Sequence, residues 1–93
     1  MIRSFGDKET RSLFERSPSR RIPQEIRRAA LMKLLLIDAA EGLEDLRIPP
    51  SNRLEKLGGD RAGRYSIRIN RQWRICFEWK GGDAHQVEIV DYH

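Results

Sequence analysis

Arg74 is the cationic residue of this sequence whose side chain is most expected to be held in one position. It lies between Trp73 and Ile75, in a segment where apolar and polar residues alternate, so packing is expected to hold its aliphatic stem. A fixed guanidinium can stabilise the negative charge that develops on a phosphoryl group in a transition state. The alternation also puts Arg68 and Arg74 on one solvent-facing side of a predicted sheet, where the pair could bind phosphate. The alternative is that both are solvated surface charges.

Asp91, Tyr92 and His93 end the sequence and bring together groups that can move or orient protons. Histidine titrates near neutral pH and can give or take a proton where arginine and lysine cannot. A terminal histidine can equally be an incidental polar end, and these residues alone leave both interpretations open. The other histidine, His85, follows Gly81-Gly82-Asp83 and is predicted to lie exposed in a turn.

Other site chemistries find little support. Asp91 and His93 have no apparent third ligand for a metal ion, and no metal or other cofactor is expected. Cys76 is the single cysteine. It therefore forms no disulfide within the chain, and it has no recognisable histidine partner for thiol catalysis. Gly58-Gly59 lacks the spacing of a phosphate-binding P-loop.

The excess positive charge lies in one segment. The chain carries 18 Lys and Arg against 14 Asp and Glu, for a net charge of +4, and 14 of the cations are arginine. Residues 53–74 hold seven of these cations against two anions, a net charge of +5, whereas the rest of the chain holds 11 cations and 12 anions. Arginine suits bidentate contact with phosphate and stacking on bases. The segment is therefore typical of a surface that binds nucleic acid.

The length of 93 residues predicts a single domain over residues 1–93 with a thin stability margin and a shallow site. The longest apolar block, Leu34 to Ile37, is interrupted by Lys33 and Asp38 and is far shorter than a membrane span. In the first five residues apolar side chains alternate with charged and polar ones too soon for a signal peptide. These features predict a cytoplasmic protein that does not contact membranes.

Two helices are predicted to precede most of the strands. A weak strand over residues 1–5 is followed by a helix capped by Asp7 and running to about Arg16. A longer helix begins near Pro23 and runs to about Ala40, with Gly42 as its C-terminal stop. Its apolar stripe, widened by Leu31 and Leu35, is expected to face the core and comprises Ile26, Ala30, Leu34 and Ile37.

The C-terminal half is predicted to be a sheet. Residues 44–51 are expected to form a loop because of Pro49-Pro50, and a strand is expected over 52–57. Alternation then predicts a hairpin of two strands around residues 64–79 with a turn at Asn70-Arg71-Gln72, and a last strand beginning near Val87. The order is strand, helix, helix and four strands. The fold class is therefore α+β, with two N-terminal helices packed on a mainly antiparallel twisted sheet of four to five strands.

The chain resembles the HigB-like toxins of the RelE superfamily. The most specific stretch is NRLEKLGGDRAGRYSIRINRQWRICF, residues 52–77, together with the terminal Val90-Asp91-Tyr92-His93. The resemblance implies a RelE-like fold and an endoribonuclease that enters the ribosomal A site and cleaves mRNA without a metal. It also implies neutralisation by a HigA-like helix-turn-helix antitoxin, with operator DNA bound only through the toxin–antitoxin complex.

The resemblance also implies roles for individual residues. Arg74 matches the arginine that holds the scissile phosphate in the family, and the terminal Asp91, Tyr92 and His93 match its catalytic group. Glu55 falls where some members have histidine, which makes it a candidate base. Some members have a lysine where this chain has Gly58. Contacts to the RNA backbone are then assigned to Arg53, Lys56, Arg61, Arg64, Arg68 and Arg71.

A non-catalytic alternative remains. The basic segment 53–74 could bind RNA or the ribosome by itself, with an inert C-terminus. A DNA-binding regulator is a weaker interpretation, since the sequence has no helix-turn-helix pattern and the predicted helices carry little net charge.

Overall fold

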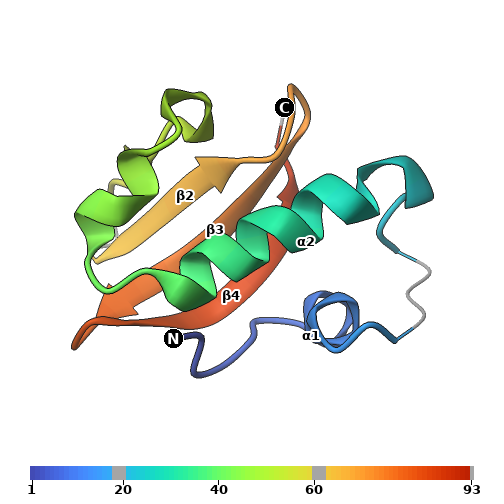
Figure 1. The fold of residues 1–93 in the computed structure, drawn as a ribbon, viewed down its shortest axis with the longest axis horizontal. Helices are drawn as coiled ribbons and strands as arrows, with labels where there is room; N and C mark the ends of the chain where they lie inside the picture. Colours follow the sequence, from blue (N-terminus) through green and yellow to red (C-terminus); the bar gives the residue numbers. More distant parts are fainter. Residues whose placement is uncertain (18–20, 60–62, 93) are drawn as a thin grey trace.

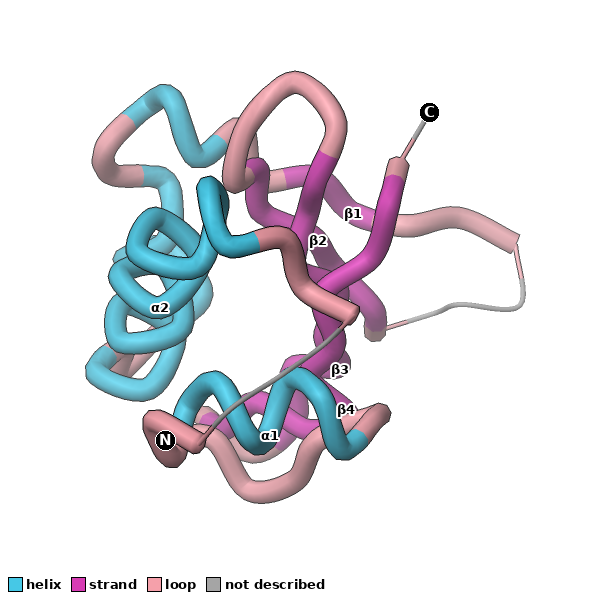
Figure 2. The backbone as a smooth tube through the Cα atoms, turned by 90° about the vertical axis from the view of Figure 1, so that its right-hand side faces the viewer, coloured by secondary structure: helices cyan, strands magenta, loops and turns pink. Residues whose placement is uncertain are grey.

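Two helices cover one face of a four-stranded sheet in the computed structural model, which describes residues 1–17, 21–59 and 63–92 (Figure 1). Figure 2 shows α2 to the left of the strands and α1 below it, next to β4. The helices are α1 (Lys8–Phe14), α2 (Gln24–Ala39) and the 3-10 helices η1 (Leu43–Arg47) and η2 (Pro50–Asn52). The strands are β1 (Glu55–Lys56), β2 (Arg64–Arg68), β3 (Trp73–Lys80) and β4 (Asp83–Asp91). They pair antiparallel in the order β1-β2-β3-β4. The predicted α+β class, with two helices on an antiparallel sheet, is confirmed.

The predicted N-terminal strand is reduced to two isolated bridges. Ile2 pairs with Ala84 and Phe5 pairs with Val87, both in parallel orientation to β4. The register of β4 shifts between these points, and Gln86 there adopts a positive φ of 52°. This bulge interrupts the ladder, so residues 1–5 do not form a continuous strand.

Helix α1 is fixed at both its start and its middle. The side chain of Asp7 accepts a hydrogen bond from the Thr10 N–H at 2.7 Å, which confirms the predicted N-cap. Thr10 is fully buried, and its Oγ1 accepts the Ile89 N–H of β4 at 3.0 Å. The helix ends at Phe14 rather than near Arg16.

Helix α2 packs its predicted stripe into the core. Its buried residues are those that the spacing predicted: Ile26, Ala30, Leu34 and Ile37. The expected widening of this stripe is wrong at Leu35, which is 37% exposed. Gly42 does not end the helix, because the backbone is already extended at Ala40. Within the described ranges, no helix is long and apolar enough to cross a membrane.

The segment between α2 and the sheet is organised around Asn52. The predicted loop contains η1 and η2, and Asn52 is fully buried at the end of η2. Its Nδ2 donates to the carbonyl oxygens of Leu46 and Ile48, each at 3.2 Å. Arg53 follows with left-handed backbone angles, φ 45° and ψ 58°. This geometry interrupts the extended chain, so the strand predicted over 52–57 shrinks to β1.

The turn predicted between β2 and β3 forms, whereas the last strand begins at Asp83 rather than near Val87. Asn70 Oδ1 accepts the N–H groups of Gln72 and Trp73, each at 2.8 Å, which closes the turn between β2 and β3. His85 is not in a turn, because β4 already begins at Asp83; it lies opposite Glu78 and is half-buried. The predicted exposed turn position for this histidine is therefore wrong.

The face of the sheet turned away from the helices is less exposed than predicted. The face toward the helices is apolar, as expected, with fully buried Ile67, Ile75 and Phe77. On the other face Ser66, Arg74 and Cys76 are 0%, 6% and 1% exposed. Arg64 of β2 reaches Glu88 of β4 at 3.6 Å, so this ion pair spans β3. The side chains of this pair are 22% and 33% exposed, so neither extends fully into solvent.

Candidate active site

Arg74 is held on the face of the sheet opposite the helices by three hydrogen bonds. Its Nε donates to Ser66 Oγ at 2.9 Å, and its Nη2 donates to the carbonyl oxygens of Arg53 and Ser66 at 2.7 and 3.3 Å. Trp73 and Ile75 do not hold it, since both belong to the core on the other face of β3. Hydrogen bonds to β2 and to the segment before β1, rather than packing, fix this guanidinium.

Glu55 lies beside the edge of Arg74 that these bonds leave free. Its Oε1 is 3.3 Å from Arg74 Nη1, and its side chain is 52% exposed while that of Arg74 is 8% exposed. The register places Glu55 directly opposite Ser66, so both lie on one face of the sheet. The site therefore pairs a buried cation with a carboxylate that solvent can reach. Such a carboxylate can accept a proton.

Tyr92 completes the group of side chains around Arg74. The Arg74 Cζ lies 5.6 Å from the centre of the Tyr92 ring, within the range of a cation–π contact. The Tyr92 N–H donates to the Gln72 carbonyl at 2.6 Å, which fixes the backbone just after β4. Arg74, Glu55 and Tyr92 are called the Arg74 cluster below. The chain brings these three together from β3, β1 and the end of β4.

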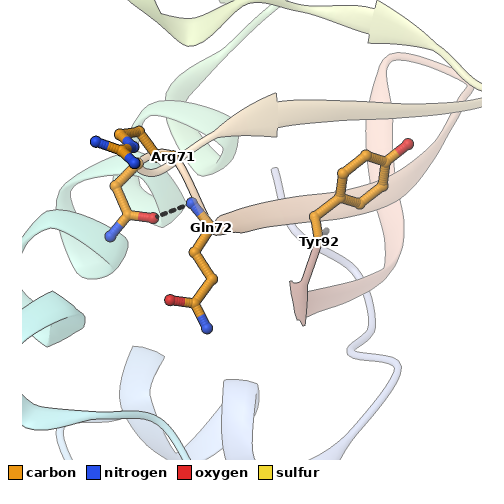
Figure 3. Close-up of a pocket in the computed structure, with 4 residues that line it drawn as sticks. Arg71, Gln72 and Tyr92 are labelled. Carbon is orange, nitrogen blue, oxygen red and sulfur yellow. Dashed lines mark hydrogen bonds between the residues drawn. The ribbon is translucent and has the colours of Figure 1, made fainter.

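Asp91 takes a different direction from Tyr92. It is paired with Trp73 across the β3–β4 ladder, and its Oδ2 accepts a hydrogen bond from Gln72 Nε2 at 3.1 Å. Gln72 and Tyr92 also border an open hollow with Asn70 and Arg71 (Figure 3). The hollow adjoins the Arg74 cluster through Tyr92. It offers amide groups, a guanidinium and an aromatic ring to a ligand.

Two predicted site residues, His93 and Arg61, lie outside the described residues. In the described part of the chain, no group of three or more His, Cys, Asp and Glu side chains is arranged to hold a metal ion.

Comparison with known proteins identifies the family. The family model described as "RelE-like toxin of type II toxin-antitoxin system HigB" matches residues 3–93. The chain belongs to this family. "Toxin HigB-1" of Vibrio cholerae serotype O1 is 44% identical over 85 residues, which cover 90% of each protein. "Endoribonuclease HigB" of Proteus vulgaris is 34% identical over 93 residues and the full length of both proteins.

Membership of the HigB-like family confirms the resemblance seen in the sequence. A third relative, an uncharacterised protein of Haemophilus influenzae, is 34% identical over 69 residues, which cover 74% of this chain and 68% of that protein. The family is defined by toxins of type II toxin–antitoxin systems. An antitoxin partner therefore follows from membership.

The cationic residues expected to contact RNA are not equally accessible in this HigB-like chain. Arg53, Lys56 and Arg71 are exposed, and Arg64 and Arg68 are half-buried. Arg64 is engaged with Glu88, and Arg68 Nε donates to the Asn70 carbonyl at 3.0 Å. The first three are therefore the most available for binding a polyanion.

Sequence reasoning missed two residues that shape this HigB-like site. Ser66 alternates with the apolar Tyr65 and Ile67, which puts it on the solvent-facing side of the predicted strand. In the structure it is fully buried and bonded to Arg74. Asn52 gave no signal beyond a strand start. An asparagine just after Pro49-Pro50 and before a short strand was the available hint, since asparagine often bonds nearby backbone groups.

Proposed function

We propose that this protein is the toxin of a type II toxin–antitoxin module and acts as a ribosome-dependent endoribonuclease on mRNA. The observation that carries the proposal is the Arg74 cluster, in which a fixed guanidinium lies beside an accessible carboxylate and a tyrosine. It is supported by the relative named Endoribonuclease HigB, which matches over the full length of both proteins. The basic segment 53–74 supplies a surface for the RNA backbone.

The proposed reaction uses the RNA's own 2′-hydroxyl. A base removes the proton of this hydroxyl, its oxygen forms a bond to the adjacent phosphorus, and the bond from phosphorus to the 5′-oxygen breaks. An acid protonates the departing 5′-oxygen. The products are a 2′,3′-cyclic phosphate and a 5′-hydroxyl end. No metal ion enters these steps, because a cationic side chain can stabilise the charged phosphorane.

The roles of Arg74 and Glu55 follow from their positions, whereas that of His93 follows from the chemistry of its imidazole and from the family resemblance. Arg74 stabilises the phosphorane through Nη1, the nitrogen beside Glu55. Glu55 serves as a secondary base, because its carboxylate is accessible and lies next to the proposed phosphate position. His93 performs the main acid or base step, and Tyr92 and Asp91 assist or orient it.

The ribosome supplies part of the positioning in this proposal. The hollow beside Tyr92 is open rather than deep, so holding mRNA in the A site would provide orientation that the toxin surface lacks. The site of action is then the cytoplasm, where translating ribosomes lie. The partner is a HigA-like helix-turn-helix antitoxin, and operator DNA is bound through that complex.

The decisive test analyses the ends of RNA cut by the purified toxin on translating ribosomes. We expect new 5′-hydroxyl ends within the translated region and 2′,3′-cyclic phosphates upstream of them. A 2′-deoxy substitution at the cleaved nucleotide should abolish the cut, since it removes the nucleophile. Translation arrest with intact mRNA would instead favour the alternative, a non-catalytic RNA- or ribosome-binding module acting through segment 53–74.

The basic segment should dominate the salt dependence of RNA binding. Replacing the exposed Arg71 with glutamine is expected to reduce the slope of log Kd against log salt by about 0.7, the value for one contact to single-stranded RNA. Fluorescence anisotropy of a labelled RNA oligonucleotide, measured from about 50 to 200 mM KCl, gives the slope. Arg47→Gln is the matched control, because Arg47 lies on η1 and pairs with Glu44. Equal slopes for the two variants would contradict the assignment.

A further inference from the structure

Hydrogen bonds within the protein limit which nitrogens of Arg74 can contact a phosphate. A guanidinium has five N–H donors. The Nε–H is used by Ser66 Oγ, and the two Nη2 hydrogens face the carbonyl oxygens of Arg53 and Ser66. The hydrogens on Nη1 are those that remain, and they lie on the side of Glu55. The bidentate approach through Nε and Nη2 is therefore blocked by the protein itself.

Ser66 holds Arg74 through two hydrogen bonds. It is fully buried on β2, and both its hydroxyl and its carbonyl oxygen accept hydrogen bonds from the guanidinium. A buried hydroxyl so placed fixes the rotation of the guanidinium about its stem, because Nε and Nη2 must point toward β2 together. Nη1 then points toward the exposed carboxylate of Glu55.

Asn52 holds the backbone next to the third acceptor of Arg74, the Arg53 carbonyl oxygen. The Arg53 carbonyl reaches Arg74 from a left-handed backbone conformation, in the residue that follows Asn52. Asn52 is bonded through Nδ2 to two carbonyl oxygens of the preceding segment, and its Oδ1 accepts a hydrogen bond from Lys33 Nζ of α2. The position of the Arg53 carbonyl is thus tied to the helical layer.

We propose that Ser66 and Asn52 are positioning residues of the toxin, which orient Arg74 so that it presents only its Nη1 edge to the scissile phosphate. This inference rests on the proposed endoribonuclease function. A rigid one-edge donor stabilises a phosphorane whose oxygen falls on that edge, and a guanidinium free to rotate would lose this selectivity for the transition state. Neither residue touches the RNA in this arrangement.

The kinetic test uses Ser66→Ala in the full chain. Misorientation of about 1 Å can cost a hundredfold in rate, so we expect kcat for ribosomal mRNA cleavage to fall about tenfold to a hundredfold with KM little changed. The control is Thr10→Val, which also removes a buried hydroxyl that accepts a hydrogen bond, but on α1. It should lower the melting temperature without lowering kcat. Equal kcat values for the two variants would overturn the proposal.

A double variant separates positioning from general damage. If Ser66 acts only through Arg74, adding Ser66→Ala to Arg74→Ala changes the single-turnover rate no further. A further fall of about tenfold in the single-turnover rate would show that Ser66 does not act through Arg74, and it would contradict the proposal.

A final measurement does not depend on catalysis. In the unmodified protein, the Arg74 Nε–H should exchange with solvent far more slowly than the Nε–H of exposed arginines such as Arg71, as measured by NMR. Fast exchange at Arg74 would overturn the proposed restraint. Slow exchange in a protein that cuts no RNA would retain the restraint and reject the function, so the two failures are distinguishable.

Discussion

Replacing Arg74 with alanine is expected to reduce the rate of mRNA cleavage by about 10²- to 10³-fold, the loss typical of removing a preorganised donor from a transition state. Arg74→Lys should lose nearly as much. A lysine keeps the charge, but it has no planar fork that could satisfy Ser66 Oγ and the Arg53 carbonyl while a nitrogen still faces Glu55. Cleavage of a reporter mRNA on purified ribosomes, measured under single-turnover conditions, gives both rates.

Folding must be controlled in the Arg74 variants, because Arg74 is only 6% exposed. Its removal leaves a buried hydroxyl and two carbonyl groups without their donor, at a cost of about 1 to 3 kcal/mol for each unsatisfied group. Thermal unfolding monitored by circular dichroism separates this loss from catalysis, since the assay temperature can be set below every midpoint. Arg47→Ala on η1 removes an exposed arginine outside the site and should cleave at the normal rate. A folded Arg74→Ala protein that retained full activity would contradict the assignment.

The fold was predictable where a single periodic pattern decides it. The stripe of α2 and the alternation of the β2–β3 hairpin identified the core face, because each pattern allows only one face to be apolar throughout. Alternation also placed Arg68 and Arg74 on one face, and the structure pairs them directly across β2 and β3. Patterns of this kind give the elements and their faces.

The depth of the candidate site was not predictable from the same patterns. Alternation assigned Arg74 to the face away from the helices but could not reveal its burial, which depends on three acceptors from two other segments. The nearness of Glu55 depends on its pairing with Ser66, set by a short strand that follows the left-handed Arg53. Contacts between segments distant in the sequence produce no periodic pattern in it. The resemblance to HigB-like toxins, rather than periodicity, singled out Glu55.

The terminal residues should show the second large effect. Deleting Tyr92 and His93 together is expected to lower cleavage by about 10²- to 10⁴-fold, the usual contribution of a positioned general acid or base. His93→Ala should account for most of this loss. It should also remove the limb of the pH–rate profile that the imidazole contributes.

The ring and the hydroxyl of Tyr92 can be distinguished by matched single substitutions. Tyr92→Phe keeps the ring that lies 5.6 Å from the Arg74 guanidinium and removes only the hydroxyl, whereas Tyr92→Ala removes both. If the ring holds Arg74 and bounds the hollow beside Gln72, phenylalanine should retain most of the rate and alanine should not. If the hydroxyl transfers a proton, both variants should be equally slow. A deletion that still arrested growth and cut translated mRNA as well as the full chain would refute catalysis by this terminus. The basic segment 53–74 would then have to account for toxicity through binding alone.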